Sequence, residues 1–194
     1  SCAGPLPQMA RAEARFCGAT CRKRASRARI AAETGGMPRE MTAKARWVRF
    51  SARKVPLTVH GRPASSTDPA TWSDFRRVHR SKVGAGAGFV LTAGDDIVCL
   101  DLDHVVREDG TLVDWAETLL KQLPATYIEV SRSGTGLHVF GWGKLPGRGR
   151  RWTYKDGTGL EVYADGRYIA MTANRWQGAP ARLADLSEVL DTLM

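Results

Sequence analysis

The segment IVCLDLDHVV, residues 97–106, places two carboxylates inside a run of apolar side chains. Buried carboxylates are unfavourable unless they are paired, hydrogen-bonded or bound to a metal ion. Because side chains alternate along a strand, Asp101 and Asp103 share one face, with Leu100 and Leu102 behind them in the core. Two carboxylates on one face can hold a divalent cation between them. A D-x-D pattern alone is a weak signal, however, and also fits a strand whose acids face solvent.

The segment SRSGTGLHVFGWG, residues 131–143, predicts a glycine-rich loop followed by a strand that opens at His138. Backbone N–H groups in such a loop can face phosphate oxygens. The loop residues suited to this role are Ser131, Ser133, Gly134 and Gly136. Taken alone, the segment is better explained as a hairpin turn beside a hydrogen-bonded structural histidine.

The segment GLEVYADGRYIAMTA, residues 159–173, predicts a hairpin with strands at 160–163 and 167–172. Glu161 is again an acid between apolar neighbours, and Arg167 lies just past the turn. The alternative is that these two residues form an ion pair on the surface.

The rest of the chain contains both helix and strand patterns. Helices are expected at 66–79, 112–123 and 183–194, and strands at 45–50, within 84–92, and at 97–103, 127–131 and 137–142. Residues 31–44 are expected to form a linker, because Gly-Gly and Pro interrupt the pattern. The whole predicts an α+β fold with an antiparallel-rich sheet.

Positive charge is concentrated at the start of the chain. Residues 1–54 hold 13 Lys/Arg and 3 Asp/Glu, whereas residues 55–194 hold 16 and 17, so the net charge of +9 arises in the first quarter. Such a segment favours a polyanionic partner, nucleic acid first, although a solvated tail is the alternative. The sequence has no apolar run long enough for a membrane span and begins without a signal-peptide pattern, so we expect a cytoplasmic protein that does not bind membranes.

Three cysteines lie in the same basic segment. Cys2, Cys17 and Cys21 are clustered, whereas Cys99 is isolated in an apolar run. Clustered cysteines in an intracellular chain indicate a structural zinc site, with free thiols in a metal-free tail as the alternative. The basic residues that follow Cys21 are expected to contact DNA phosphates from a helix: Arg22, Lys23, Arg24 and Arg27.

The order of the three acid- and glycine-containing segments resembles the archaeo-eukaryotic primase superfamily, in particular the primase–polymerase domains of actinobacterial phages and plasmids. The resemblance is carried by KVP (54–56), ASSTDPATWSDF (64–75), GAGFVL (86–91), IVCLDLDH (97–104), EVSRSGTGLHVFG (129–141) and GLEVYADGRYIAMTAN (159–174). It implies a primase-like catalytic domain over residues 45–194, with an RRM-like mixed or antiparallel sheet and flanking helices.

The resemblance also assigns roles to the acids. Asp101, Asp103 and Glu161 would bind the two divalent ions, Mg²⁺ or Mn²⁺, that nucleotidyl transfer requires. His138 would help to hold the incoming triphosphate, together with the 131–136 loop, Arg167 and, as a weaker candidate, Lys54.

One position departs from the superfamily pattern. The middle motif is often Ser-x-His, but this chain has Gly136 two residues before His138. The sequence leaves open whether Ser131, Ser133 or backbone groups alone assist the histidine.

Residues 1–30 resemble small zinc-binding modules of the form C-x2-C-G-x-P-L…R-F-C-S-x2-C-R-x-R-A, which precede actinobacterial DNA-binding and replication domains. In that comparison Cys2 is the second cysteine, and the first would precede Ser1.

These resemblances imply a DNA primase and polymerase of phage or plasmid replication in a bacterial host. The expected partners are single-stranded DNA, dNTPs or NTPs, and a replicative helicase or a helicase domain of the same longer protein. Two alternatives stay open. One is a zinc-containing DNA-binding replication protein without catalysis. The other is a phosphatase of the haloacid-dehalogenase type, for which DLDHV would be the nucleophile strand of a parallel sheet.

Overall fold

The computed structural model describes residues 16–147 and 149–194, without the side chains of residues 27 and 29–33. The chain divides into two compact units, Ser1–Gly36 and Met37–Met194. In the described part of the first unit, a single helix, α1 (Ala19–Thr34), is rich in alanine and arginine, which favour helices. None of the described helices combines the length and apolar character that a membrane span needs.

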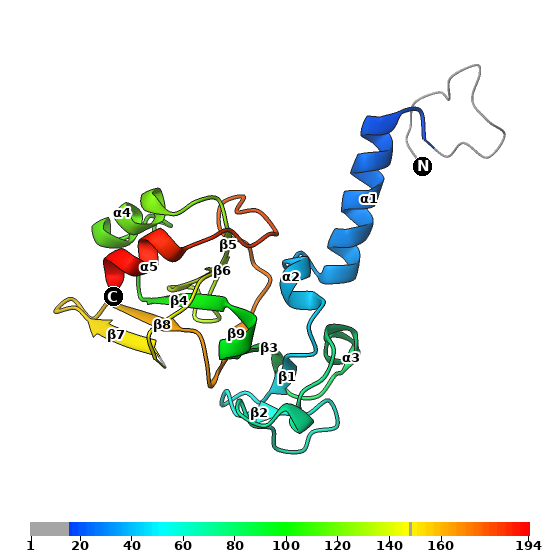
Figure 1. Ribbon diagram of the computed structural model, residues 1–194, viewed down its shortest axis with the longest axis horizontal. Coiled ribbons are helices and arrows are strands. Elements are labelled where there is room, and N and C mark those ends of the chain that lie inside the picture. The colour runs from blue at the N-terminus through cyan, green and yellow to red at the C-terminus, as the bar shows by residue number, and fades with distance from the viewer. Residues whose placement is uncertain (1–15, 148) are drawn as a thin grey trace. The chain divides into compact units, whose positions relative to one another are not determined.

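The described residues of the second unit form four α-helices and two sheets (Figure 1). The helices are α2 (Arg39–Thr42), α3 (Phe75–Arg80), α4 (Asp114–Gln122) and α5 (Ser187–Leu193), and short 3-10 turns occupy η1 (Pro69–Thr71) and η2 (Ala93–Asp95). The four-stranded sheet has the order β2 (Pro56–Leu57), β1 (Trp47–Phe50), β3 (Gly86–Leu91), β9 (Arg167–Met171). The five-stranded sheet has the order β5 (Tyr127–Val130), β6 (Leu137–Trp142), β4 (Ile97–Asp103), β8 (Gly159–Tyr163), β7 (Gly149–Thr153).

Every pairing between these strands is antiparallel. The expected α+β class with antiparallel sheets is therefore confirmed. The parallel sheet that the haloacid-dehalogenase alternative requires does not occur among the described strands, so that alternative is wrong.

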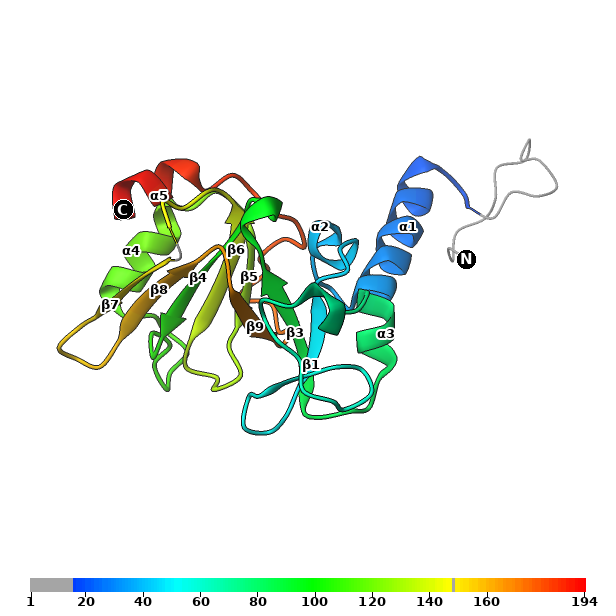
Figure 2. The same ribbon diagram turned by 60° about the horizontal axis from the view of Figure 1, so that its bottom comes forward.

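Strand β4 is covered differently on its two faces. Leu100 and Leu102 are fully buried in a cluster that includes Ala116 of α4 and Leu190 of α5. Figures 1 and 2 show α4 and α5 side by side over this face of the five-stranded sheet. The apolar alternation of the strand thus places its leucines under the helices and leaves the intervening residues on the opposite face.

The opposite face of β4 changes character along the strand. At its start, Cys99 packs in a second cluster with Trp47 and Phe89 of the four-stranded sheet. At its end, Asp101 and Asp103 are half-buried rather than buried. The four-stranded sheet therefore covers the first half of this face, and the second half is open to a cleft.

Two predicted elements differ in the structure. The segment 66–79 is not one helix, because the backbone is extended at Trp72, after η1. Helix α3 then begins with Asp74 as its N-cap, and the Asp74 carboxylate accepts a hydrogen bond from the Arg77 N–H.

The strands predicted as a hairpin at 159–173 do not pair with each other. Strand β8 pairs with β4 and β7, and β9 pairs with β3, so the intervening turn joins the two sheets.

Strand β7 and two short helical segments were not expected. Strand β7 is exposed along almost its whole length and rich in arginine, so its sequence shows little of the apolar alternation that marks a strand. Within the expected linker, residues 31–34 complete α1 and residues 39–42 form α2, whose Met41 is fully buried.

Candidate active site

The strand register aligns five polar residues in one row across the five-stranded sheet. Asp101 lies opposite His138 of β6 on one side and opposite Glu161 of β8 on the other. Beyond them, Glu129 of β5 lies opposite His138, and Arg151 of β7 lies opposite Glu161. Because directly opposed residues of antiparallel strands share a face, all five side chains lie on the face away from α4 and α5.

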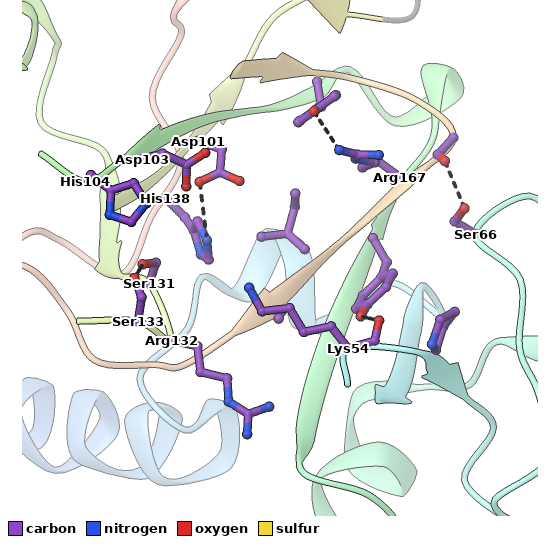
Figure 3. Close-up of a pocket in the computed structure, with 16 residues that line it drawn as sticks. Lys54, Ser66, Asp101, Asp103, His104, Ser131, Arg132, Ser133, His138 and Arg167 are labelled. Carbon is purple, nitrogen blue, oxygen red and sulfur yellow. Dashed lines mark hydrogen bonds and ion pairs between the residues drawn. The ribbon is translucent and has the colours of Figure 1, made fainter. Parts of the chain in front are cut away.

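Two members of the row, Asp101 and His138, line a cleft of about 620 Å³ that lies at the end of β4 and the start of β6. Figure 3 shows Asp101, Asp103 and His138 together at one side of this cleft. Cationic side chains also line it, and they come from three different segments: Lys54, Arg132 and Arg167. Acids that face a ring of cations suit a ligand that carries both a metal ion and phosphate groups.

Asp101 lacks full compensation for its negative charge. Burial raises the pKa of Asp101, and the nearby charges of Asp103 and Glu161 raise it further, against the opposing effects of His138 and Lys54. A divalent cation would relieve this repulsion. Asp101 and Asp103 therefore fit an oxygen-ligated Mg²⁺ or Mn²⁺ that completes its shell with phosphate oxygens and water.

Glu161 is held by arginines. Its carboxylate lies 2.9 Å from Arg151 Nε and 3.6 Å from Arg167 Nη2, and it accepts a hydrogen bond from the Tyr163 hydroxyl. Burial, followed by that hydrogen bond, raises the pKa of Tyr163 to about 12. Across residues 16–147 and 149–194, no three carboxylate, imidazole or thiol groups are gathered closely enough to ligate one ion as they stand. Glu161 is therefore engaged by the two arginines and not gathered with the aspartates around one ion.

His138 is buried between two acids. Its Nδ1 lies 3.0 Å from Glu129 Oε1, and its Nε2 lies 3.7 Å from Asp101 Oδ1. Burial acts to lower the pKa of His138, but the hydrogen bond with Glu129 and the charges of Asp101, Glu129 and Asp103 outweigh it, so the pKa is raised. The positively charged imidazolium is thereby favoured beside the cleft.

Sequence reasoning missed Glu129, although the signal was present. Like Asp101 and Glu161, it is an acid between apolar residues of a strand, here Ile128 and Val130. It is fully buried, and the same argument about the cost of burying a carboxylate would have marked it.

The 131–136 loop lies against the end of β4. Ser131 Oγ is 3.0 Å from Ser133 Oγ, and both serines line the cleft. A Cβ atom added at Gly136 would lie 2.6 Å from the Leu102 carbonyl oxygen, which explains why glycine replaces the serine of the superfamily pattern here. Gly134 has a φ of +83°, a conformation that glycine adopts without strain.

Three basic residues border the cleft. Arg132, which the sequence analysis did not select, places its guanidinium 5.4 Å from the centre of the Phe50 ring. Arg167 lies 4.5 Å above the Tyr163 ring and donates to its hydroxyl at 2.7 Å. Lys54 is exposed, and its carbonyl oxygen accepts a hydrogen bond from the Tyr168 hydroxyl of β9.

Two of the three clustered cysteines lie in the described part of the chain. Cys17 and Cys21 place their sulfur atoms 3.0 Å apart at the start of α1, and Cys2 lies outside the described residues. The basic side chains of α1 that the structure describes among those predicted to contact DNA are exposed: Arg22, Lys23 and Arg24. The side chain of Arg27 is outside the described part.

The sequence is similar to known proteins over most of its length. The family of bifunctional DNA primase/polymerase N-terminal domains (Prim-Pol) matches residues 31–191. A protein of Nitratiruptor phage NrS-1 named DNA Primase-polymerase is 42% identical over an alignment of 138 residues, and the match covers 68% of this chain and 19% of the phage protein. The chain therefore spans less than a fifth of that relative's length. On this match and on the acids and histidine aligned in one cleft, the chain belongs to the bifunctional DNA primase/polymerase family.

Proposed function

We propose that residues 37–194 form the catalytic domain of a DNA primase-polymerase, which synthesises primers on single-stranded DNA and extends them by nucleotidyl transfer. The observation that carries the proposal is the placement of Asp101, Asp103 and His138 at one side of a cleft whose other walls are cationic. Family membership and the name of the phage relative support the same reaction.

In this proposal the acids bind the metal ions. Asp101 and Asp103 hold Mg²⁺ or Mn²⁺, and Glu161 joins them when Arg151 and Arg167 release its carboxylate. When bound there, the ions would supply activation of the attacking 3′-hydroxyl and neutralisation of the charge on the leaving pyrophosphate.

The cationic side chains serve the nucleotide. His138, at the base of the cleft, donates from Nε2 to a triphosphate oxygen, and Lys54 and Arg132 approach from other walls. Arg167 has two roles, because the guanidinium that now pairs with Glu161 can turn to the triphosphate. Nucleotide binding would thereby remove one of the two arginine pairs that hold Glu161.

In this proposal the first unit binds the DNA template. The exposed cations of α1 bind DNA phosphates, and Cys17 and Cys21 contribute to a zinc site together with Cys2 and a fourth ligand. In a phage or plasmid replication system, a helicase, either separate or part of the same longer protein, would expose the single-stranded template.

Incorporation of labelled nucleotides on single-stranded DNA with Mn²⁺ tests the proposal. Asp101→Asn and Asp103→Asn are expected to lower incorporation by at least about 100-fold, because each removes a charge from the metal site. Asp191→Asn is the matched control, since it removes the same charge from an exposed position on α5 and should leave incorporation unchanged.

Two results would contradict the proposal. Near-normal incorporation by either aspartate variant would remove that residue from the metal site. DNA binding by the wild-type protein without any incorporation would favour the DNA-binding protein without catalysis.

A further inference from the structure

The side-chain carboxylate of Glu129, in the middle of strand β5, accepts four hydrogen bonds. Its Oε1 accepts from His138 Nδ1 at 3.0 Å and from the Thr172 N–H at 3.1 Å. Its Oε2 accepts from the Ala173 N–H at 2.9 Å and from the Tyr127 hydroxyl at 2.8 Å. Four donors from three separate segments thus converge on one carboxylate that is fully buried.

The backbone that supplies two of these donors is itself held in place. Thr172 Oγ1 donates to the Val130 carbonyl at 2.7 Å, which ties the segment after β9 to β5. Ala173 has a φ of +58°, in the left-handed region that is unfavourable for a residue with a side chain. Ala173 therefore directs its N–H at Glu129 in a strained backbone conformation. The neighbouring hydrogen bond from Thr172 to Val130 helps to hold this conformation.

This carboxylate determines how the ring of His138 is presented. A carboxylate only accepts hydrogen bonds, so the contact at Nδ1 requires a proton on that nitrogen. The hydrogen bond also prevents the ring from turning over and exposing a C–H edge to the cleft. Nε2, the other ring nitrogen, consequently faces Asp101 and the cleft.

We propose that Glu129 is a positioning residue for nucleotide binding: it fixes His138 so that Nε2 is presented to the triphosphate. The proposal rests on the function proposed above, because it assigns the triphosphate as the ligand of His138. Glu129 itself lies behind the histidine and acts through it.

The first test uses the wild-type protein. NMR of ¹⁵N-labelled histidine reports which ring nitrogens carry protons. A hydrogen-bonded, strongly deshielded proton is expected on Nδ1 of His138. An Nδ1 without a proton would overturn the proposal, whether or not the protein incorporates nucleotides.

The second test compares two substitutions at the same carboxylate. Glu129→Gln removes the charge and leaves one acceptor oxygen for His138 and the backbone donors. Tyr127→Phe is the matched control, because it removes a donor to Oε2 and leaves the contact between Oε1 and His138 intact. Both are examined by binding of a non-hydrolysable nucleotide triphosphate in the presence of Mg²⁺, a readout that needs no catalysis.

Glu129→Gln is expected to weaken nucleotide binding about tenfold or more, as for groups that orient a ligand-bearing histidine, and Tyr127→Phe is expected to change it less than about threefold. Combined with His138→Ala, Glu129→Gln should cause little additional loss, because its effect passes through the histidine. Equal weakening by Tyr127→Phe, or a full additional loss in the double variant, would overturn the proposal. A wild-type protein that binds nucleotide but never incorporates it would contradict the polymerase function alone.

Discussion

At position 101 a half-buried carboxylate faces a histidine on one neighbouring strand and a glutamate on the other. The environment works against its charge, because burial, Asp103 and Glu161 all raise the pKa of Asp101. Such a residue lowers the stability of the protein without its ligand, and ligand binding explains its presence. The conflict between stability and charge is therefore local evidence of a ligand site.

The same conflict gives a stability prediction. Without metal, Asp101→Asn is expected to raise the free energy of unfolding at pH 7 by on the order of 1 kcal/mol, because the amide carries no charge that burial penalises. Thermal unfolding in EDTA measures this. With Mn²⁺ added, the wild-type protein should gain stability and the variant should gain less, since ligands stabilise the state that binds them. Equal stabilisation of both by Mn²⁺ would place the metal elsewhere.

Single residues also connect elements that are far apart in the sequence. Asp95, at the end of η2, accepts from Lys44 Nζ at 2.7 Å and from Arg46 Nε at 2.8 Å, and Thr92 donates to the same carboxylate. This cluster fixes the start of β1 to the turn that leads into β4. Because β4 carries Asp101 and Asp103, the cluster helps to position the strand from which they project.

Asp95 predicts how stability responds to pH. Burial acts to raise the pKa of Asp95, but the hydrogen bonds from Lys44, Arg46 and Thr92 outweigh it, so the pKa is lowered. A lowered pKa means that the ionised form favours folding. Its contribution is complete above the ordinary aspartate pKa and is lost as the pH falls from there through the lowered value.

Asp95→Asn is therefore expected to cost about 1–2 kcal/mol at pH 7, and the difference from wild type should shrink below about pH 4. Urea unfolding at both pH values measures it. Asp96→Asn is the control, because Asp96 is half exposed, lies 3.7 Å from Lys144 and has a φ of +52°, which asparagine tolerates. A cost for Asp95→Asn that does not depend on pH would show that the charge contributes nothing.

At the scale of the whole molecule, the density of positive charge differs between the two units. Residues 1–36 hold 7 basic and 2 acidic residues, an excess of +5, whereas residues 37–194 hold 22 and 18, an excess of +4 over a much longer segment. Long-range attraction of DNA scales with this excess and weakens with salt. We therefore expect the first unit to contribute affinity for the template, and the acids and cations of the cleft in the second unit to act on the nucleotide.

Deleting residues 1–30 should consequently impair primer initiation by about tenfold or more and primed extension only a few-fold, because initiation must hold two nucleotides and a template without a duplex. Dinucleotide formation and primed extension, each assayed for both forms at two salt concentrations, measure the effect. The affinity of the full chain for DNA should also fall more steeply with salt than that of the truncated chain. Equal losses in both activities would show that the first unit is not an initiation device.

The sequence by itself determined the features that depend on short-range rules. Side-chain alternation placed Asp101 and Asp103 on one face of a strand with Leu100 and Leu102 on the other, and the bounds of β4 and β6 agree with the predicted strands. The resemblance of several motifs in order identified the family, which the comparisons confirmed. Such signals survive in a sequence because a strand has a period of two and a motif has a fixed spacing.

The tertiary structure alone decided what lies beside each of these residues. Glu129, His138, Asp101 and Glu161 form one row because of the register of four strands, and the segments 159–163 and 167–171 separate into different sheets although a short turn joins them. The pairing of Glu161 with Arg151 and the donors from residues 172 and 173 to Glu129 also come from distant segments. Register and strand partners depend on burying whole faces of the sheets against other elements, and this balance of long-range packing has no local signature in the sequence.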